Sequence, residues 1–413
     1  MKIAIAGAGV AGLAAALALA RQGAEIHVFE RFAKPQPVGA GLLLQPTGQE
    51  ALRDLGLLER VQGFGASVRR LDGRTARGRK VLDLAYKGTA ETDWGLGIHR
   101  GALFTVLNEA VLATAVRFHL GDAVADIDET ERPVVACESG AKHGPFDLVL
   151  IAEGAHSKLR ERLSPGAYAP VYPWGAVWTV VPDRTNAFAG TLRQVYDGAR
   201  VMAGVLPIGH DPAASDATPC IAFFWSVMGR DLDAWRAGDF ARWKKEMRTL
   251  WPALEPLLDE MPSAAIFTPA TYRDVRLRKW TKGHVLFIGD AAHGMSPQLG
   301  QGANLALIDC VTLAHCLRAD TDIDAALAAY ERLRRPHTDY YQFASRWLTP
   351  VFQSHSRVMG WTRDAFLGSL CHVPLAGAVM RLTLEGRMQW RPRLWRVDPA
   401  VNTTSEAVAP SPR

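Results

Sequence analysis

The sequence is poor in cysteine, and its cysteines have no spacing that suits a disulfide framework or a metal site. Its 413 residues include five cysteines, an odd number, and no two of them form a C-x-x-C pair. We therefore predict reduced thiols, no bound metal and a cytoplasmic protein.

The sequence also lacks a long apolar run and any cluster of like charge. Its apolar stretch nearest to membrane length, Leu367–Leu384, contains His372, Pro374 and Arg381, so it does not predict a membrane-spanning helix. The net charge of +5 is spread thinly, with no run of five lysines or arginines. Such a balance suits an anionic cofactor or substrate as well as nucleic acid, and without a basic cluster we expect no nucleic-acid partner.

The N-terminal segment follows the pattern of a dinucleotide-binding βαβ unit. An apolar strand, Lys2–Ala6, runs into a G-x-G-x-x-G loop, and a helix and a second strand follow. In this pattern Gly7 permits the tight turn, Gly9 lets a pyrophosphate approach the backbone, and Gly12 allows helix and strand to pack closely. Glu30 ends the second strand, where a carboxylate accepts hydrogen bonds from an adenosine ribose.

A second glycine-rich loop occurs late in the chain, between a buried strand and a long helix. The strand, Val285–Ile288, is continuously apolar, and Asp290 follows it directly. Gly300 and Gly302 then precede the helix, whose N-terminus favours negative charge. We therefore expect a ligand with anionic and hydroxyl groups at this loop, and we place Asp309 on the polar side of the helix.

The character of the chain changes between these two segments. From about Tyr168 to Arg276, short alternating runs predict a second, mostly antiparallel sheet inserted into the first unit. We predict a discontinuous α/β domain (1–167 and 277–340), the inserted sheet (168–276), a C-terminal helical region (341–397) and a disordered tail (398–413).

Three further elements are predicted from periodicity and from helix-breaking residues. They are an antiparallel meander made of Val116–Leu120, Ala123–Ile127 and Pro133–Glu138, a helical segment over Leu232–Met261, and a helix over Ile323–Arg335 that ends at Pro336.

Taken together, residues 1–340 resemble the single-component FAD-dependent aromatic hydroxylases, which have a para-hydroxybenzoate-hydroxylase-like fold. The segments that carry the resemblance are Gly7–Gly12 with Glu30-Arg31, Ile98–Leu103, Asp147–Arg160 and Gly289–Asp309. The resemblance implies an α/β fold with a Rossmann-like, GR2-type FAD-binding domain. It also implies FAD as cofactor and NAD(P)H as a transient co-substrate. The protein would have no separate Rossmann domain for NAD(P)H, which would bind in a groove.

The resemblance also assigns site residues. The implied cofactor-binding residues are Gly7, Gly9, Val10, Ala11, Gly12, Glu30, Arg31, Gly41, Leu42, Arg100, Glu153, Asp290, Gly300, Gly302, Ala303 and Asn304. Pro297 beside the flavin and Gln45 at the flavin–substrate space are the catalytic candidates, while Tyr196, Phe224 and Trp225 are candidates for the substrate side. The family's middle motif usually reads Asp-Gly, whereas this sequence has Glu153-Gly154. The longer acid keeps the charge but shifts its reach, so we expect this difference to bear on how efficiently NAD(P)H reduces the flavin.

The implied activity is hydroxylation of a small aromatic substrate, phenol-like or polycyclic, with NAD(P)H and O2 through a flavin C4a-hydroperoxide. An FAD-dependent dehydrogenase without oxygen insertion is the main alternative. A flavin-dependent halogenase is disfavoured, because Pro173–Trp178 does not supply its Trp-x-Trp-x-Ile-Pro motif. A non-catalytic flavin protein is a less favoured hypothesis, and so is membrane-surface contact through Phe343–Arg387. We expect a monomer or homodimer.

Overall fold

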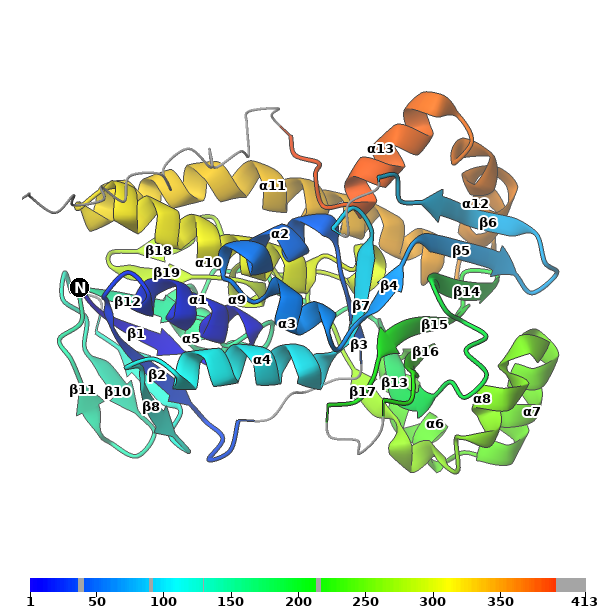
Figure 1. Ribbon diagram of the computed structural model, residues 1–413, viewed down its shortest axis with the longest axis horizontal. Helices are drawn as coiled ribbons and strands as arrows, with labels where there is room; N and C mark the ends of the chain where they lie inside the picture. The colour runs from blue at the N-terminus through cyan, green and yellow to red at the C-terminus, as the bar shows by residue number, and fades with distance from the viewer. Residues whose placement is uncertain (36–40, 89–91, 129, 213–216, 391–413) are drawn as a thin grey trace, which may run out of the picture.

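A six-stranded, mostly parallel sheet organises the first part of the molecule (Figure 1). The computed structural model describes residues 1–35, 41–88, 92–128, 130–212 and 217–390. Five strands are parallel, and β18 pairs antiparallel at one edge. The order across the sheet is β18 (Thr281–Lys282), β19 (Val285–Phe287), β12 (Leu148–Ile151), β1 (Lys2–Ala6), β2 (Glu25–Glu30), β8 (Arg117–Leu120).

Helix α1 (Val10–Ala20) is buried along most of its length, which explains its alanine- and leucine-rich sequence. It packs against α4 (Arg100–Leu112) and α10 (Gly302–Ala319), so it has apolar neighbours on more than one face. This arrangement places the starts of α1 and α10 next to each other, although they are almost three hundred residues apart in the chain.

Two three-stranded sheets and three short helices complete this part. One sheet contains β9 (Val124–Ile127), β10 (Val135–Cys137) and β11 (Lys142–His143), and the other contains β3 (Gly41–Leu44), β7 (Gly95–His99) and β4 (Ala66–Val68). The helices are α2 (Pro46–Asp54), α3 (Leu58–Gln62) and α5 (Lys158–Leu163). The predicted meander was wrong at its first strand, because Val116–Leu120 contributes β8, which pairs parallel with β2 in the main sheet.

The second large sheet has seven strands and is mostly antiparallel, which confirms the predicted fold class. Its order is β17 (Thr268–Ala270), β13 (Trp174–Pro182), β16 (Cys220–Met228), β15 (Val201–Gly209), β14 (Thr191–Asp197), β5 (Arg70–Thr75), β6 (Lys80–Ala85). The last two strands come from before the predicted insertion, and β5 pairs parallel with β14. The sheet therefore extends beyond the inserted segment, and the domain boundaries stay a prediction.

Short helices cover one face of the seven-stranded sheet. They are η1 (Gly229–Asp231), α6 (Leu232–Ala237), α7 (Phe240–Leu250), η2 (Pro252–Leu254), α8 (Glu255–Asp259) and η3 (Ala264–Ile266). The predicted helical segment Leu232–Met261 is thus interrupted, at Gly238 and again at Trp251-Pro252. Trp243 of α7 packs against Phe223 and Phe267, so this cluster is a second hydrophobic core.

The C-terminal helices run alongside both parts (Figure 1). They are α11 (Ile323–Phe352), α12 (Arg357–Leu370) and α13 (Pro374–Leu384). The predicted end of this helix at Pro336 was wrong, because Pro336 lies inside α11 and the helix continues to Phe352. Side chains on both sides of Pro336 are buried, including Arg334 and Tyr341, so packing holds the helix together there. Within the described ranges no single helix is long and apolar enough to cross a membrane; α12 and α13 reach that composition only as a pair bent by 103°.

A buried ionic network joins α10, α11 and the loop before α10. Asp309 is fully buried, contrary to its predicted place on the polar side, and it accepts from Arg334 Nε at 2.8 Å and His293 Nε2 at 2.6 Å. Burial alone would raise the pKa of Asp309, but His293 and Arg334 lower it to about 2. Asp309 therefore remains a carboxylate that neutralises Arg334 inside the core.

Asp309→Asn is expected to destabilise the fold by about 3–5 kcal/mol, because it leaves the buried Arg334 guanidinium without its counter-charge. Chemical denaturation of the FAD-loaded protein measures this. The matched acid-to-amide control is Glu246→Gln, which removes an exposed partner of Arg242 and is expected to cost less than about 1 kcal/mol. Equal effects of the two substitutions would contradict the assignment.

His337 is the pH-sensitive member of the network. Its Nδ1 accepts from Arg334 and its Nε2 donates to the Gly386 carbonyl at 2.7 Å, a pattern that requires a neutral ring. Burial, together with the charge of Arg334, lowers the pKa of His337 from 6.5 to about 3.

The unfolded chain therefore binds a proton at His337 between about pH 6.5 and 3 that the folded chain does not bind. The free energy of unfolding should fall as the pH drops through this window, with a slope from this group approaching about 1.4 kcal/mol per pH unit. His337→Gln should remove that part of the slope, and His355→Gln, at an exposed position, should leave it in place. Denaturant titrations across this pH range test the assignment.

Candidate functional site

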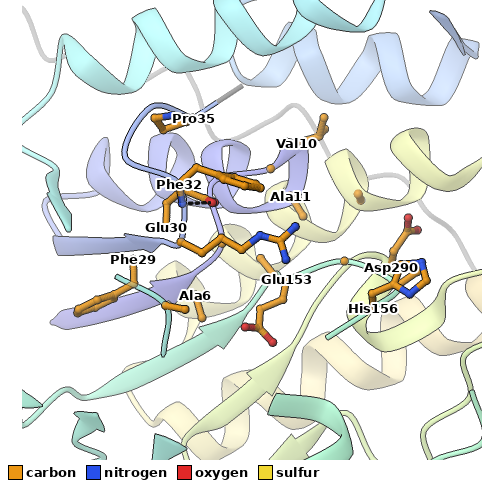
Figure 2. A pocket seen from close by; sticks show the side chains of 18 of the residues that line it. Ala6, Val10, Ala11, Phe29, Glu30, Phe32, Pro35, Glu153, His156 and Asp290 are labelled. Atoms are coloured by element: carbon orange, nitrogen blue, oxygen red, sulfur yellow. Dashed lines mark hydrogen bonds between the residues drawn. The ribbon is translucent and has the colours of Figure 1, made fainter. Parts of the chain in front are cut away.

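A cleft of about 430 Å³ opens where the parallel strands end and α1 and α10 begin (Figure 2). It is lined by segments that lie far apart in the chain, between Ala6 and Ala306. Of the predicted cofactor residues, those that line it are Gly7, Gly9, Val10, Ala11, Glu30, Arg31, Arg100, Glu153, Asp290, Gly302 and Ala303.

The first glycine loop has a different constraint at each glycine. Gly7 has φ +106°, a conformation that side chains disfavour, and its N–H donates to the Phe29 carbonyl at 2.8 Å. A Cβ on Gly12 would lie 1.8 Å from the Gly7 carbonyl oxygen, so Gly12 is required for packing. A Cβ on Gly9 would meet no described protein atom within 4 Å, which leaves space for a ligand in the cleft.

Two helix N-termini point their free N–H groups toward this cleft. Neither α1 nor α10 has a side-chain cap from a described residue, and no acidic side chain lies in the first turn of either. Orphan N–H groups and the positive end of the helix dipole together make an anion-binding site. Such a site suits a pyrophosphate.

Two carboxylates lie at opposite sides of the cleft, Glu30 on one and Asp290 on the other (Figure 2). Glu30 accepts from the N–H groups of Ala8 at 2.9 Å and Phe32 at 3.0 Å, which fixes its orientation. A carboxylate can accept further hydrogen bonds through its remaining lone pairs, so both side chains can bind hydroxyl groups.

The buried Asp309 network holds the turn that carries Asp290. Helix α9 (Asp290–His293) is one turn long, and Gly289 before it has φ +58°. Asp309 accepts from the Gly289 N–H at 3.0 Å and from His293, so it contacts both ends of this turn. The position of Asp290 is therefore set by a charge in the core.

Glu153, at the family's usual Asp position, caps the next helix. Its carboxylate accepts from the Ser157 hydroxyl at 2.7 Å and from the Leu159 N–H at 3.2 Å, at the start of α5. The longer side chain therefore reaches the helix start while still lining the cleft. Arg160 of the same helix is buried and donates to the Ala291 carbonyl at 3.3 Å, which ties α5 to the Asp290 turn.

Arg100 lines the cleft from the first residue of α4, where its guanidinium is exposed. The residue before it, His99, accepts from the Gly101 N–H at 3.1 Å. Burial lowers the pKa of His99, which keeps the ring neutral and able to accept this bond. His99 thus caps the helix that presents Arg100.

Asn304 does not line the cleft but joins three segments around it. Its Oδ1 accepts from the Gln45 N–H at 2.8 Å, and its Nδ2 donates to the carbonyls of Leu43 and Gly300. A Cβ on Gly48 would lie 1.9 Å from that Oδ1, so the contact is tight. Asn304 therefore fixes the turn at Gly300 against β3 and α2.

Gln45 is completely buried and lies next to the same turn. Its Oε1 accepts from the Tyr86 hydroxyl, while its Nε2 has no partner among the described residues and lies 3.9 Å from the Cβ position of Gly300. Buried amide nitrogens in proteins normally have a partner, so this donor indicates a ligand acceptor beside Gly300.

Gly12 and Gly300, described above, do not line the cleft, and neither do three other predicted residues. A Cβ on Gly41 would approach Ala222 and Ile208 within 2.7 Å, so this glycine allows β3 to pack on the seven-stranded sheet. Leu42 packs on the core of the first domain. Pro297 is exposed at the start of η4 (Pro297–Leu299).

The loop before α10 also contacts the C-terminal helix. Gln301 Nε2 donates to the carbonyls of Thr383 at 3.3 Å and Leu384 at 2.8 Å, at the end of α13. The Thr47 N–H contacts the Glu385 carbonyl at 3.4 Å, just beyond it. The C-terminal end of α13 is thus attached to the site through hydrogen bonds to its backbone.

Sequence reasoning missed several lining residues, which come from elements that have no motif. Phe104 lies on α4, Val124 on β9 and Glu138 just after β10, and all three line the cleft. The signal that could have found them is the sheet order, since β8 beside β2 brings the following β9 and β10 to this edge.

Comparison with known proteins agrees with this geometry. A family model described as an FAD binding domain matches residues 1–341. A kynurenine 3-monooxygenase from Salinispora arenicola is 32% identical over 82% of this chain and 77% of its own. A 3-amino-4-hydroxybenzoate 2-monooxygenase from Streptomyces cremeus is 32% identical over 85% and 88%.

The chain belongs to the FAD-dependent aromatic monooxygenases. A solved structure, Klebsiella pneumoniae HpxO complexed with FAD and uric acid, has the same fold, with a TM-score of 0.77 at 21% identity over 94% of this chain and 97% of that one. The cleft of the monooxygenase fits FAD, because open space at Gly9, two uncapped helix starts and two carboxylates match its pyrophosphate and hydroxyl groups.

The three aromatic candidates for the substrate side lie on two faces of the seven-stranded sheet. Tyr196 is buried under the Arg363 guanidinium and beside Phe352, and Trp225 packs toward Trp243 in the second core. The Phe224 ring packs against Trp178, on the other face of the sheet from Trp225. Neighbouring residues of a strand point to opposite faces, so Trp225 cannot share a wall with Phe224, whereas Tyr196 and Phe224 belong to one buried cluster.

Gly9→Ala should leave the protein folded and lower its affinity for FAD by about tenfold or more, because the new methyl occupies cleft space that the pyrophosphate needs. Gly12→Ala is the matched control: its methyl meets the Gly7 carbonyl, so it should destabilise the fold instead. Flavin fluorescence titration and chemical denaturation separate the two effects. Unchanged FAD affinity in Gly9→Ala would contradict the role given to Gly9.

Proposed function

We propose that this monooxygenase uses NAD(P)H and O2 to hydroxylate a small, electron-rich aromatic ring that carries a hydroxyl or amino group. The observation that carries the proposal is the single cleft in which Glu30, Asp290 and the uncapped starts of α1 and α10 converge. The supporting comparisons are the FAD family model and the two monooxygenase relatives at 32% identity.

In this proposal the chain holds FAD at both ends. Glu30 accepts hydrogen bonds from the adenosine ribose, and the N–H groups at the start of α1 bind the pyrophosphate. Asp290 accepts from hydroxyl groups of the ribityl chain. The start of α10 supplies further N–H donors, and Arg100 adds positive charge near the phosphates.

Bound FAD supplies the electron transfer from NAD(P)H and the activation of O2. The protein orients it and keeps water away from the reacting oxygen. Gln45 is the buried donor nearest the Gly300 turn, and its free Nε2 is positioned to donate to a ligand acceptor there. Pro297, three residues before Gly300, shapes the outer side of the same turn.

The proposed substrate class rests on the relatives. Their names refer to kynurenine, 3-amino-4-hydroxybenzoate, urate and 2-heptyl-3-hydroxy-4(1H)-quinolone. Kynurenine and aminohydroxybenzoate each carry an amino group on a benzene ring, and such donors activate a ring carbon toward electrophilic oxygen. We extend this shared chemistry to the present chain. We also propose that the enzyme is a monomer or homodimer.

The test is turnover of the FAD-loaded enzyme with NADH or NADPH over a panel of phenols, aminobenzoates, quinolones and related polycyclic rings. The expected result is substrate-dependent NAD(P)H oxidation that consumes O2 and yields a product heavier by one oxygen, with the label from 18O2. Equal turnover without O2 would instead support an FAD-dependent dehydrogenase. A product that carries oxygen from water would exclude the monooxygenase reaction.

A further inference from the structure

The outer surface of α12 and α13 is apolar where a surface helix is normally polar. Nine large apolar side chains are exposed on this helical pair and the turn between them, among them Trp361 at 65% and Leu375 at 78% exposure. The full set is Val358, Met359, Trp361, Phe366, Leu370, Val373, Leu375, Val379 and Leu382. We call this set the apolar face.

The outward stripe of α13 consists entirely of aliphatic residues. Leu375, Val379 and Leu382 follow one another at helical spacing and are all exposed. The turn between the helices continues the same surface, because Leu370 and Val373 beside it are exposed too. Exposed apolar surface of this extent, contributed by two consecutive helices, marks an interaction site.

A basic hairpin lies beside the apolar face. The tip between β5 and β6, residues 74–80, contains Arg74, Arg77, Arg79 and Lys80 and has no acidic residue. Arg79 donates to the Ala365 carbonyl of α12 at 2.9 Å, and a Cβ on Gly368 would lie 2.4 Å from the Lys80 carbonyl. The tip is therefore packed directly on α12, at the same end of the molecule (Figure 1).

The positive charge at this end is available to a partner. Arg77, Arg79 and Arg357 form no ion pair with a described residue, and all three are exposed. The acids beside them are already neutralised: Asp83 pairs with Arg70 and Lys80, and Asp364 pairs with Arg363. A pocket of about 250 Å³ between the tip and α12 includes Arg79, Lys80 and Ser369, which can donate to a phosphate.

The distribution of charge along the chain also favours an anionic partner. Residues 343–397 contain eight arginines and two acids, a net charge of +6, whereas residues 1–342 contain thirty-eight basic and thirty-eight acidic side chains. The excess charge of the sequence thus falls in the C-terminal segment that includes α12 and α13, although three of its eight arginines (Arg391, Arg393 and Arg396) lie outside the described residues.

We propose that the apolar face and the basic tip dock this monooxygenase on an anionic lipid bilayer. The aliphatic and aromatic side chains enter the interface between headgroups and acyl chains, and the arginines bind lipid phosphates. The 103° bend between α12 and α13 suits helices that lie along a surface rather than cross it. A two-fold contact between copies would bring two surfaces of net positive charge together, which disfavours that alternative.

The test is flotation of the full-length, FAD-loaded protein with vesicles of phosphatidylcholine containing about one-third phosphatidylglycerol. The wild-type protein should float with these vesicles, less with pure phosphatidylcholine, and less as salt is raised. Leu375→Glu should lower the partition coefficient by about tenfold or more, because it replaces an inserted leucine with a charge. Leu112→Glu, at another exposed leucine on α4, is the matched control and should float as the wild type does.

The charge component has its own matched pair. Arg77→Glu should weaken binding to the anionic vesicles by about tenfold, whereas Arg278→Glu, at an exposed arginine elsewhere, should not. Flavin absorbance and circular dichroism confirm that each variant is folded. Wild-type protein that stays off anionic vesicles, or Leu375→Glu that floats like wild type, would overturn the proposal. A different outcome would assign the apolar face to a second copy of the chain. In that case the wild-type protein would not float, and sedimentation velocity would show that it self-associates while Leu375→Glu does not.

Discussion

The site depends on a single buried carboxylate. Asp309 lies on α10, yet its hydrogen bonds reach the Gly289 N–H, His293 and Arg334, so it joins a turn of the first domain to the long helix α11. Charge is expensive to bury, and this one is retained where it fixes the turn that carries Asp290. The network thereby holds the turn before α10 against α10 and α11.

The cleft shows how the fold divides the work of binding between backbone and side chains. N–H groups at the starts of α1 and α10 are available to an anion and need no particular side chain, while Arg31, Arg100 and Lys158 add positive charge to the lining. The two carboxylates provide the remaining specificity. This explains why small residues dominate the loops: a side chain at Gly9 would enter the space that the ligand uses, and one at Gly12 would separate helix from strand.

The cofactor half could be predicted well from the sequence, because its signals are local. Gly7, Gly9 and Glu30 lie in one βαβ unit, and the strand before Asp290 is continuously apolar, so spacing alone indicates their place. Contacts between distant segments could not be predicted. Asp309 was placed on a polar face because its partners, His293 and Arg334, lie on other elements, and Asn304 holds the Gly300 turn together instead of lining the cleft.

The second sheet was predicted less completely, for the same reason. Strand β5 pairs parallel with β14 across more than a hundred residues, and nothing in either segment specifies that partner. Phe224 and Trp225 are adjacent in the sequence but point to opposite faces, which only the register shows. The relatives show the family, which local motifs already indicated, whereas these pairings depend on the whole fold.

The attachment of α13 to the flavin loop has a consequence for truncation of this chain at its C-terminal helices. Gln301, Thr47 and His337 all depend on backbone carbonyls of residues 383–386 as acceptors. Deleting the last helices would leave these buried donors without partners beside the cofactor. The C-terminal segment is therefore not an appendage that evolution or an experimenter can remove cleanly. Its inner end must be kept or replaced by another chain that offers the same carbonyls.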